Sequence, residues 1–197
     1  MTTVDKSEHS AASDDANRAS KNVTWLMLVY RVPSEPTRHR AAVWRRLRNL
    51  GAVYLQNSVA AIPHSDDRER AFRALRNEIT QKMKGKAYLM TSTALAGELD
   101  LIGTMNAARN DEYDEILDKC VDFHAGIAKE VVEKHFTYGE LEENEEDFNK
   151  LVGWFAKVKS RDALGADGSP AVDEALQGCS KALEDFAAQV YAADHDS

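Results

Sequence analysis

Three short apolar runs have the length and composition of β-strands. The run Thr24–Val32 is rich in β-branched and aromatic residues and ends at Pro33, and the run Ala52–Ile62 ends in the same way at Pro63. The third run is Lys86–Thr93. Runs of this length, bounded by proline or glycine, are typical of strands in a buried sheet. The pattern therefore predicts three strands, with Ala52–Ile62 as a single strand.

Two amphipathic helices are predicted between these strands. In Arg38–Leu50 the apolar residues Val43, Trp44, Leu47 and Leu50 recur at helical spacing, and Gly51 follows where a helix ends. A second helix is predicted from Ser65, an N-cap residue type followed by acidic residues, to Gly85. Its apolar stripe is Phe72, Leu75, Ile79 and Met83. The order strand–helix–strand–helix–strand predicts an α+β fold of the ferredoxin-like plait type.

The chain has a different pattern after Gly97. Long helices are predicted over residues 99–135, over about 140–164 and after the linker 165–170. In the first and third of these helices, apolar positions alternate in steps of four and three, the heptad spacing of helices that pack on one another. They are Tyr113, Leu117, Cys120, His124, Ile127 and Val131, then Val172, Leu176, Cys179, Leu183, Phe186 and Val190. We therefore expect an extension of about three helices, packed on the plait or on a partner.

These patterns divide the chain into four segments. Residues 1–22 are expected to be a disordered tail, 23–97 the α/β domain, 98–192 the helical extension and 193–197 a short tail. No apolar run approaches the roughly 18 residues that a membrane span needs, and the first 22 residues contain no hydrophobic stretch, so we do not expect them to be a secretory signal. The two cysteines are too few for a disulfide scaffold. We expect a soluble, cytoplasmic protein that does not bind a membrane.

Charge is distributed unevenly along the chain. The formal net charge is -8, but residues 31–86 hold 13 Lys or Arg against 5 Asp or Glu, a local charge of +8. Residues 98–197 hold 9 against 24, a local charge of -15. Because local potential steers binding more than total charge does, the basic segment is compatible with nucleic-acid binding. The alternative is that the acidic segment neutralises it by folding against it.

Clustered basic residues are the candidate DNA-binding residues. They are Arg38, Arg40, Arg45, Arg46 and Arg48 on the first predicted helix, with Arg70, Arg73 and Lys84 on the second. A guanidinium group forms bidentate contacts with phosphate. In a plait both helices usually cover one sheet face, so we expect the two rows to merge into one positive surface. The alternative interpretation is a solvated helix face with some arginines paired to acidic residues of the C-terminal half.

A metal site is a less favoured hypothesis. Cys120, His124 and Cys179 would converge if their helices were antiparallel, and these residue types bind zinc. All three, however, are at expected core positions, where a free cysteine behaves as a small apolar residue. The sequence contains no glycine-rich phosphate loop, no serine nucleophile motif and no carboxylate in an apolar context. We therefore expect no catalytic activity and no cofactor.

Several segments resemble the N-terminal domain of ChrB, a regulator of chromate resistance. In chain order they are WLMLVY (25–30), VPSEP (32–36), VWRRLRNLGAVYLQNSV (43–59), MNAARNDEYDEIL (105–117), FTYGELEENEEDF (136–148) and FAAQVYA (186–192). The resemblance covers about residues 23–192. It implies a role in chromate-responsive control of transcription, linked to DNA, in a bacterial cytoplasm.

A fainter likeness concerns residues 25–59. The order apolar–Tyr–x–x–Pro, basic helix, Leu-Gly and Gln-x-Ser-Val is similar to the middle domain of PaaX-type repressors and to the small CRISPR-associated adaptation nucleases, which are ferredoxin-like dimers. Those nucleases carry a metal-binding aspartate directly after the tyrosine of the first strand. Here Tyr30 is followed by Arg31. The likeness therefore implies a homodimeric plait without metal-dependent nuclease activity.

Three functions remain open at this point. The first is a regulator that binds DNA through the arginine-rich helix, with a dimer setting the spacing. The second is an interaction module whose helical extension recruits a ChrB C-terminal-type protein in trans, since ChrB proteins usually continue into a further domain and this sequence stops at Ser197. The third is an oxyanion sensor, because chromate is attracted to the same arginines as phosphate.

Overall fold

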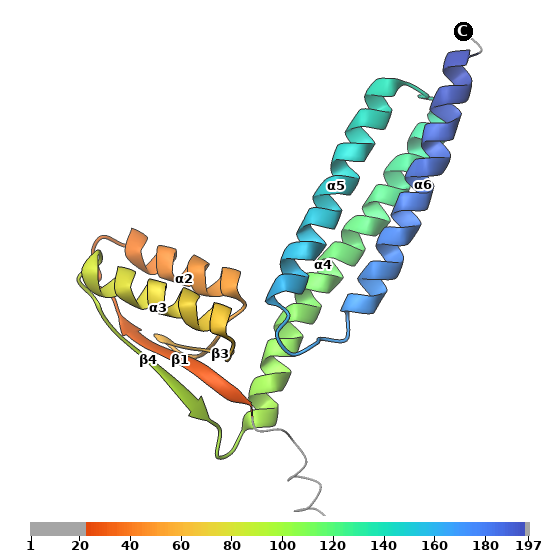
Figure 1. The fold of residues 1–197 in the computed structure, drawn as a ribbon. Helices are drawn as coiled ribbons and strands as arrows, with labels where there is room; N and C mark the ends of the chain where they lie inside the picture. Colours follow the sequence, from red (N-terminus) through yellow and green to blue (C-terminus); the bar gives the residue numbers. More distant parts are fainter. Residues whose placement is uncertain (1–22, 196–197) are drawn as a thin grey trace, which may run out of the picture. The chain divides into compact units, whose positions relative to one another are not determined.

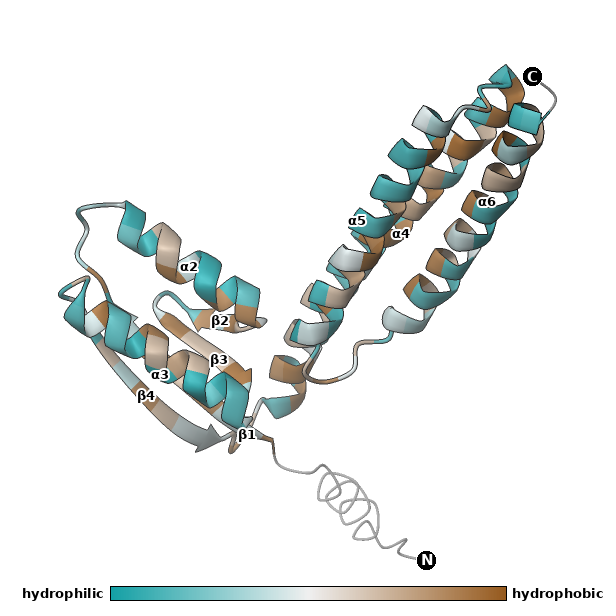
Figure 2. Ribbon diagram, turned by 45° about the horizontal axis from the view of Figure 1, so that its top comes forward, coloured by the Kyte–Doolittle hydropathy of each residue, from teal (hydrophilic) through white to brown (hydrophobic). Residues whose placement is uncertain are grey.

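The computed structural model describes residues 23–195, and the tails expected at 1–22 and 196–197 lie outside this range. The strands β1 (Thr24–Arg31), β2 (Val53–Gln56), β3 (Val59–Pro63) and β4 (Lys86–Thr93) form one antiparallel sheet in the order β2-β3-β1-β4. Figure 1 shows this sheet with β1, β3 and β4 labelled, and Figure 2 labels β2. Helix α2 (Arg38–Leu50) joins β1 to β2, and α3 (Asp66–Gln81) joins β3 to β4. This is the ferredoxin-like plait that the sequence predicts.

The prediction of a single strand over Ala52–Ile62 was wrong. This segment forms a hairpin, in which β2 and β3 are joined by a turn at Asn57 and Ser58. Ser58 has a φ of 66°, and its carbonyl oxygen accepts a hydrogen bond of 2.9 Å from the Tyr30 amide. Two-residue hairpin turns need such left-handed conformations, which asparagine and glycine signal most clearly. Asn57 was therefore a usable signal, but the prediction missed the turn because it is short and lies inside a largely apolar run.

The sheet and α3 share an apolar core. Leu26, Leu28 and Ile62 are buried on the strands, and α3 lies against β1 and β4. The predicted stripe of α3, Phe72, Leu75, Ile79 and Met83, is buried as expected. The Ser65 side chain accepts a hydrogen bond from the Arg68 amide and caps the helix. This cap and stripe fix which side of α3 remains exposed.

Contacts divide the chain into two compact units. Among the described residues, one unit contains 23–39 together with Tyr54–Glu98, and the other contains Arg40–Val53 together with 99–195. The second unit includes three long helices, α4 (Glu98–Glu133), α5 (Tyr138–Arg161) and α6 (Ser169–His195), as the sequence predicts. Their hydrophilic and apolar residues are interspersed as amphipathic helices require (Figure 2).

The heptad positions of the helical extension form its own core. Tyr113, Cys120 and Ile127 of α4 are buried in one cluster with α6 residues such as Cys179 and Phe186. His124 is exposed, so the expectation that it occupies a core position was wrong. No helix in the described part of the chain is long and apolar enough to cross a membrane.

Candidate nucleic-acid interface

Helix α2 presents a row of exposed arginines. Its buried residues are Val43 and Leu47, one helical turn apart, so the arginines lie outside the buried stripe. All five predicted residues are exposed, namely Arg38, Arg40, Arg45, Arg46 and Arg48. No described residue forms an ion pair with Arg38, Arg45, Arg46 or Arg48. These four guanidinium groups are therefore accessible to an anionic ligand.

Trp44 also belongs to the exposed surface of α2. Its side chain is 47% exposed, so its expected place in the buried stripe was wrong. The guanidinium carbon of Arg48 lies 5.4 Å from the centre of its ring. Such stacking stabilises an arginine weakly at an exposed site and leaves its N–H groups free to donate. The tryptophan therefore orients one of the arginines without neutralising it.

On α3, the predicted arginines are paired within their own helix. Arg70 forms an ion pair with Asp67, and Arg73 Nε donates a hydrogen bond of 2.7 Å to Glu69. Glu69 also lies 2.8 Å from His64 Nε2, and the hydrogen bonds from His64 and then Arg73 lower the pKa of this carboxyl. Both arginines are therefore paired, but with acidic residues in the first turn of α3 and not with the C-terminal half that the alternative interpretation named.

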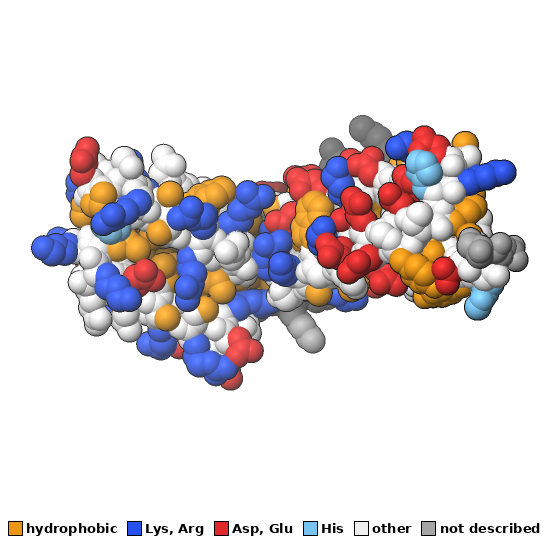
Figure 3. All heavy atoms as spheres, turned by 90° about the horizontal axis from the view of Figure 1, so that it is seen from above, with side chains coloured by type: hydrophobic (Ala, Val, Ile, Leu, Met, Phe, Trp, Pro, Cys, Tyr) orange, Lys and Arg blue, Asp and Glu red, His pale blue; other side chains and the backbone are white. Residues whose placement is uncertain are grey.

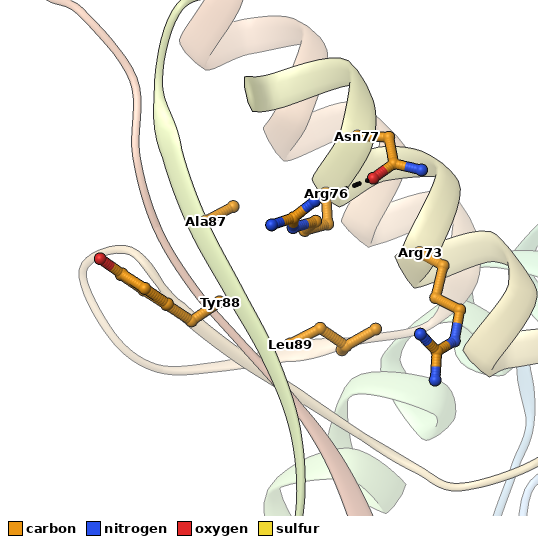
Figure 4. Close-up of a pocket in the computed structure, with 6 residues that line it drawn as sticks. All are labelled: Arg73, Arg76, Asn77, Ala87, Tyr88 and Leu89. Carbon is orange, nitrogen blue, oxygen red and sulfur yellow. Dashed lines mark hydrogen bonds between the residues drawn. The ribbon is translucent and has the colours of Figure 1, made fainter. Parts of the chain in front are cut away.

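A hollow of about 360 Å³ lies between α3 and β4 (Figure 4). Arg73, Arg76 and Asn77 line it from α3, and Ala87, Tyr88 and Leu89 line it from β4. In Figure 4 the Arg76 and Leu89 side chains point into the space between the helix and the strand, whereas Tyr88 points to the other face of the strand. Arg76 Nη1 donates a hydrogen bond of 3.1 Å to Asn77 Oδ1.

Arg76 was missed by the sequence-based prediction. It is three residues after Arg73, and residues three apart on a helix are neighbours on its surface. This spacing was therefore a usable signal. Lys84, which was predicted, is exposed in the connection to β4 and has a φ of 53°. The structure therefore adds Arg76 to the predicted basic residues of α3 and of the connection between α3 and β4.

The space-filling view shows the same charge separation as the sequence. Lys and Arg are the prevailing charged side chains on the visible surface of the part that contains the sheet, and Asp and Glu are frequent on the helical extension (Figure 3). On the extension, the lysines are commonly paired with neighbouring acids, as Lys119 is with Asp122 and Lys150 with Asp147. Its cations are therefore poor candidates for binding a polyanion.

The three weak metal-ligand candidates do not form a cluster in the described part of the chain. Cys120 and Cys179 are both buried, and the Sγ of Cys179 donates to the backbone oxygen of Cys120 at 3.7 Å. Burial raises the pKa of both thiols, that of Cys179 to about 12. Within residues 23–195, the ligand atoms of these cysteines and His124 do not gather as a metal-binding group would.

Comparison with known proteins identifies one family. A family model for the N-terminal region of protein ChrB matches residues 40–197, which include most of α2 and everything after it. Searches of curated proteins and of solved structures gave no match. The family match covers well over half of the chain and confirms the resemblance that the sequence segments indicate. The chain therefore belongs to the ChrB N-terminal family, which is associated with the regulation of chromate resistance.

Proposed function

We propose that this chromate-resistance regulator binds DNA phosphates through the arginines of α2. The observation that supports this proposal is the row of four exposed guanidinium groups, on Arg38, Arg45, Arg46 and Arg48, without an ion-pair partner among the described residues. A phosphate contact from such a group releases condensed counterions without first breaking an internal ion pair. Arg70 and Arg73 would have to exchange their own carboxylates for phosphate, so they are expected to contribute less.

The position of Arg31 supports DNA binding without metal-dependent cleavage. It lies at the end of β1 directly opposite Lys86 on β4. Two cations at this position disfavour the binding of a divalent metal ion. The CRISPR-associated nucleases with a similar plait bind their metal ion through the residue that directly follows the first-strand tyrosine. We therefore infer that the plait serves binding and not phosphodiester cleavage.

The salt dependence of DNA binding tests the proposal directly. We would substitute Arg45, Arg46 and Arg48 with Gln and measure binding to a mixed-sequence duplex by fluorescence anisotropy across a series of salt concentrations. Each lost phosphate contact is expected to reduce the slope of log K against log salt by about 0.9, so three contacts reduce it by roughly 2.7. Affinity at low salt should fall correspondingly.

A matched control separates this local effect from a change in net charge. Replacing Lys119, Lys150 and Lys181 of the helical extension with Gln removes the same charge from residues that are paired with acids. This variant should retain the salt slope of the unchanged protein. An α2 variant that binds with unchanged affinity and slope would contradict the proposal, as would equal losses in both variants.

The hollow between α3 and β4 favours a second candidate function, the binding of a small oxyanion. Arg73 and Arg76 both line a space of about 360 Å³, and Asn77 adds an amide. Because Arg73 is paired with Glu69, Arg76 supplies the guanidinium group that has no carboxylate partner among the described residues. Tetrahedral dianions such as chromate and sulfate accept hydrogen bonds from groups of this kind. A site of this size would admit either ion, so the chemistry fits the oxyanion class.

Calorimetry with chromate and with sulfate would test this second candidate. We expect binding heat that disappears in Arg76→Gln and persists in Arg70→Gln, because Arg70 belongs to the same helix but does not line the hollow. Absence of heat with both anions in the unchanged protein would remove the candidate. Heat that survives Arg76→Gln would place the anion elsewhere.

The heptads no longer support the hypothesis that the helical extension is an interaction module. The heptad positions that suggested a partner helix are used inside the three-helix unit, where Tyr113, Cys120, Ile127, Cys179 and Phe186 pack on one another. Recruitment of a ChrB C-terminal-type protein stays a prediction. Light scattering of the chain mixed with such a protein would test it, and masses equal to those of the separate proteins would count against it.

A further inference from the structure

The two edges of the sheet differ in length and protection. The order β2-β3-β1-β4 places β2 and β4 at the edges, and β2 has 4 residues whereas β4 has 8. An edge strand exposes unpaired N–H and C=O groups, and proteins usually protect it by shortness, proline, charge or a bulge. Strand β4 contains no proline and one charged residue, Lys86 at its start. Its pairing with β1 is continuous from Arg31–Lys86 to Thr24–Thr93, so it has no bulge.

Exposed apolar side chains continue across the sheet to this edge. Tyr88 and Met90 are 62% and 43% exposed. They lie directly beside Val29 and Met27 of β1, which are only partly buried. The intervening side chain of Leu89 points toward α3 instead (Figure 4). One face of β4 is therefore an apolar stripe that ends at a row of backbone groups to which no strand within residues 23–195 is paired.

We propose that β4 pairs in antiparallel fashion with β4 of a second copy of this chain. Pairing of this kind joins the two sheets of 4 strands into one continuous sheet. Directly opposite residues in antiparallel strands point to the same face of the sheet. A two-fold axis beside Leu89 satisfies this condition, because it places each Tyr88 opposite Met90 of the other copy. Aromatic rings and thioethers make favourable contacts, and here the contact forms twice.

Self-complementarity favours a second copy as the occupant of this edge. In the register centred on Leu89, Lys86 lies opposite the uncharged Ser92, so no like charges meet along the strands. The two α3 helices lie on the same side of the joined sheet, and each brings Arg73 and Arg76 to that side. Their mutual repulsion should be screened by salt. The dimer is therefore expected to strengthen as salt rises, opposite to DNA binding by α2.

Charge placed on the strand provides a test that is specific for the register. The double variant Tyr88→Lys with Met90→Lys puts a lysine opposite a lysine twice, and Tyr88→Lys with Met90→Glu puts a lysine opposite a glutamate twice. Sedimentation equilibrium of the full chain should show a dimer that the first variant weakens by roughly tenfold or more and the second restores. Leu55→Lys on the other edge strand, where the side chain is 45% exposed, is the matched control and should leave the dimer unchanged.

A disulfide cross-link provides an independent measurement. Leu89→Cys places two thiols beside the two-fold axis, within reach of a disulfide, whereas Thr93→Cys at the end of the strand does not. Mild oxidation should therefore cross-link the first variant and not the second, while the buried Cys120 and Cys179 remain reduced. Circular dichroism of every variant would verify its fold.

Three results would overturn the proposal. If the unchanged protein stays monomeric at high concentration and high salt, β4 does not pair with a second copy, and the occupant of this edge would be an extended segment of another protein. A dimer that is indifferent to both double variants would lie elsewhere on the surface. A dimer weakened equally by both double variants, with no cross-link through position 89, would use another register. The inference is independent of the proposed DNA contact, since none of these readouts involves DNA.

Discussion

A buried ion-pair network in the helical unit leads to the largest stability effect that we predict. One carboxylate oxygen of Glu112 accepts hydrogen bonds of 2.9 Å from Arg109 Nη1 and 2.9 Å from Arg161 Nη2. The side chains of Glu112 and Arg109 are only 11% and 8% exposed. Burial lowers the pKa of Arg109, and the charge of Glu112 opposes that shift. Removing the carboxylate would leave two guanidinium groups without their shared counter-charge.

We therefore expect Glu112→Ala to lower the free energy of unfolding by about 3–5 kcal/mol, the usual cost of breaking a buried pair by removing one partner. The surroundings offer little compensation, because Arg161 Nε is already buried without a hydrogen-bond partner in the described structure. The measurement is denaturant unfolding followed by circular dichroism, with the slope compared between variants.

An exposed pair provides the matched control for this experiment. Asp147 lies 2.8 Å from Lys150, and both side chains are more than half exposed. Such pairs contribute about 0–1 kcal/mol, so Asp147→Ala should change stability little. If Glu112→Ala costs less than about 1 kcal/mol and matches the control, the network is hydrated and the reasoning from burial is wrong.

Three further predictions concern single groups. The thiols of Cys120 and Cys179 should not react with a disulfide reagent at neutral pH until the protein unfolds, because burial raises the pKa of both; reaction of the folded protein would contradict this. Gly85→Ala should destabilise the protein by about 1–3 kcal/mol in thermal unfolding, since an added Cβ would lie 2.5 Å from a backbone oxygen of β1. In an NMR titration Glu69 should have a pKa below the ordinary glutamate value, and His64→Gln should raise that pKa. The stability that this lowered pKa contributes to the folded protein is present above the unfolded-state pKa of Glu69 and is lost as pH falls through the folded-state pKa.

Periodicity predicted most of the fold because most of the chain is helical and amphipathic. The stripe of α3 and most heptad positions of α4 and α6 are core positions, so their spacing located the helices. The prediction failed at Asn57 and Ser58, where a two-residue turn interrupts an apolar run without a glycine or proline. It also failed at Trp44 and His124, which have helical spacing but lie at the margin of the buried stripe. Spacing identifies a face, whereas tertiary contacts decide how wide that face is.

The candidate site was predicted less completely than the fold, because the sequence shows which residues are charged but not which of them are paired with a carboxylate. The sequence identified the arginines of α2 and α3 equally, but Arg70 and Arg73 have carboxylate partners one turn away. The hollow beside Arg76 depends on the distance between α3 and the edge strand, which is a property of the packed sheet. Similarly, the open edge of β4 follows from strand order, which local sequence does not encode.

The difference between the two basic helices decides what each can do. Helix α2 contains no acidic residue, and its Arg38, Arg45, Arg46 and Arg48 have no ion-pair partner among the described residues, so these four keep their charge available for a polyanion. Helix α3 begins with Asp66, Asp67 and Glu69, which favour its N-terminal dipole and also pair with its arginines. Long-range attraction should therefore come mainly from α2, and α3 should act only on a ligand small enough to reach Arg76 in the hollow. Substitutions in α2 should accordingly change DNA binding without changing oxyanion binding, and Arg76→Gln should do the reverse; one variant that abolished both would show that the two helices form a single anion site.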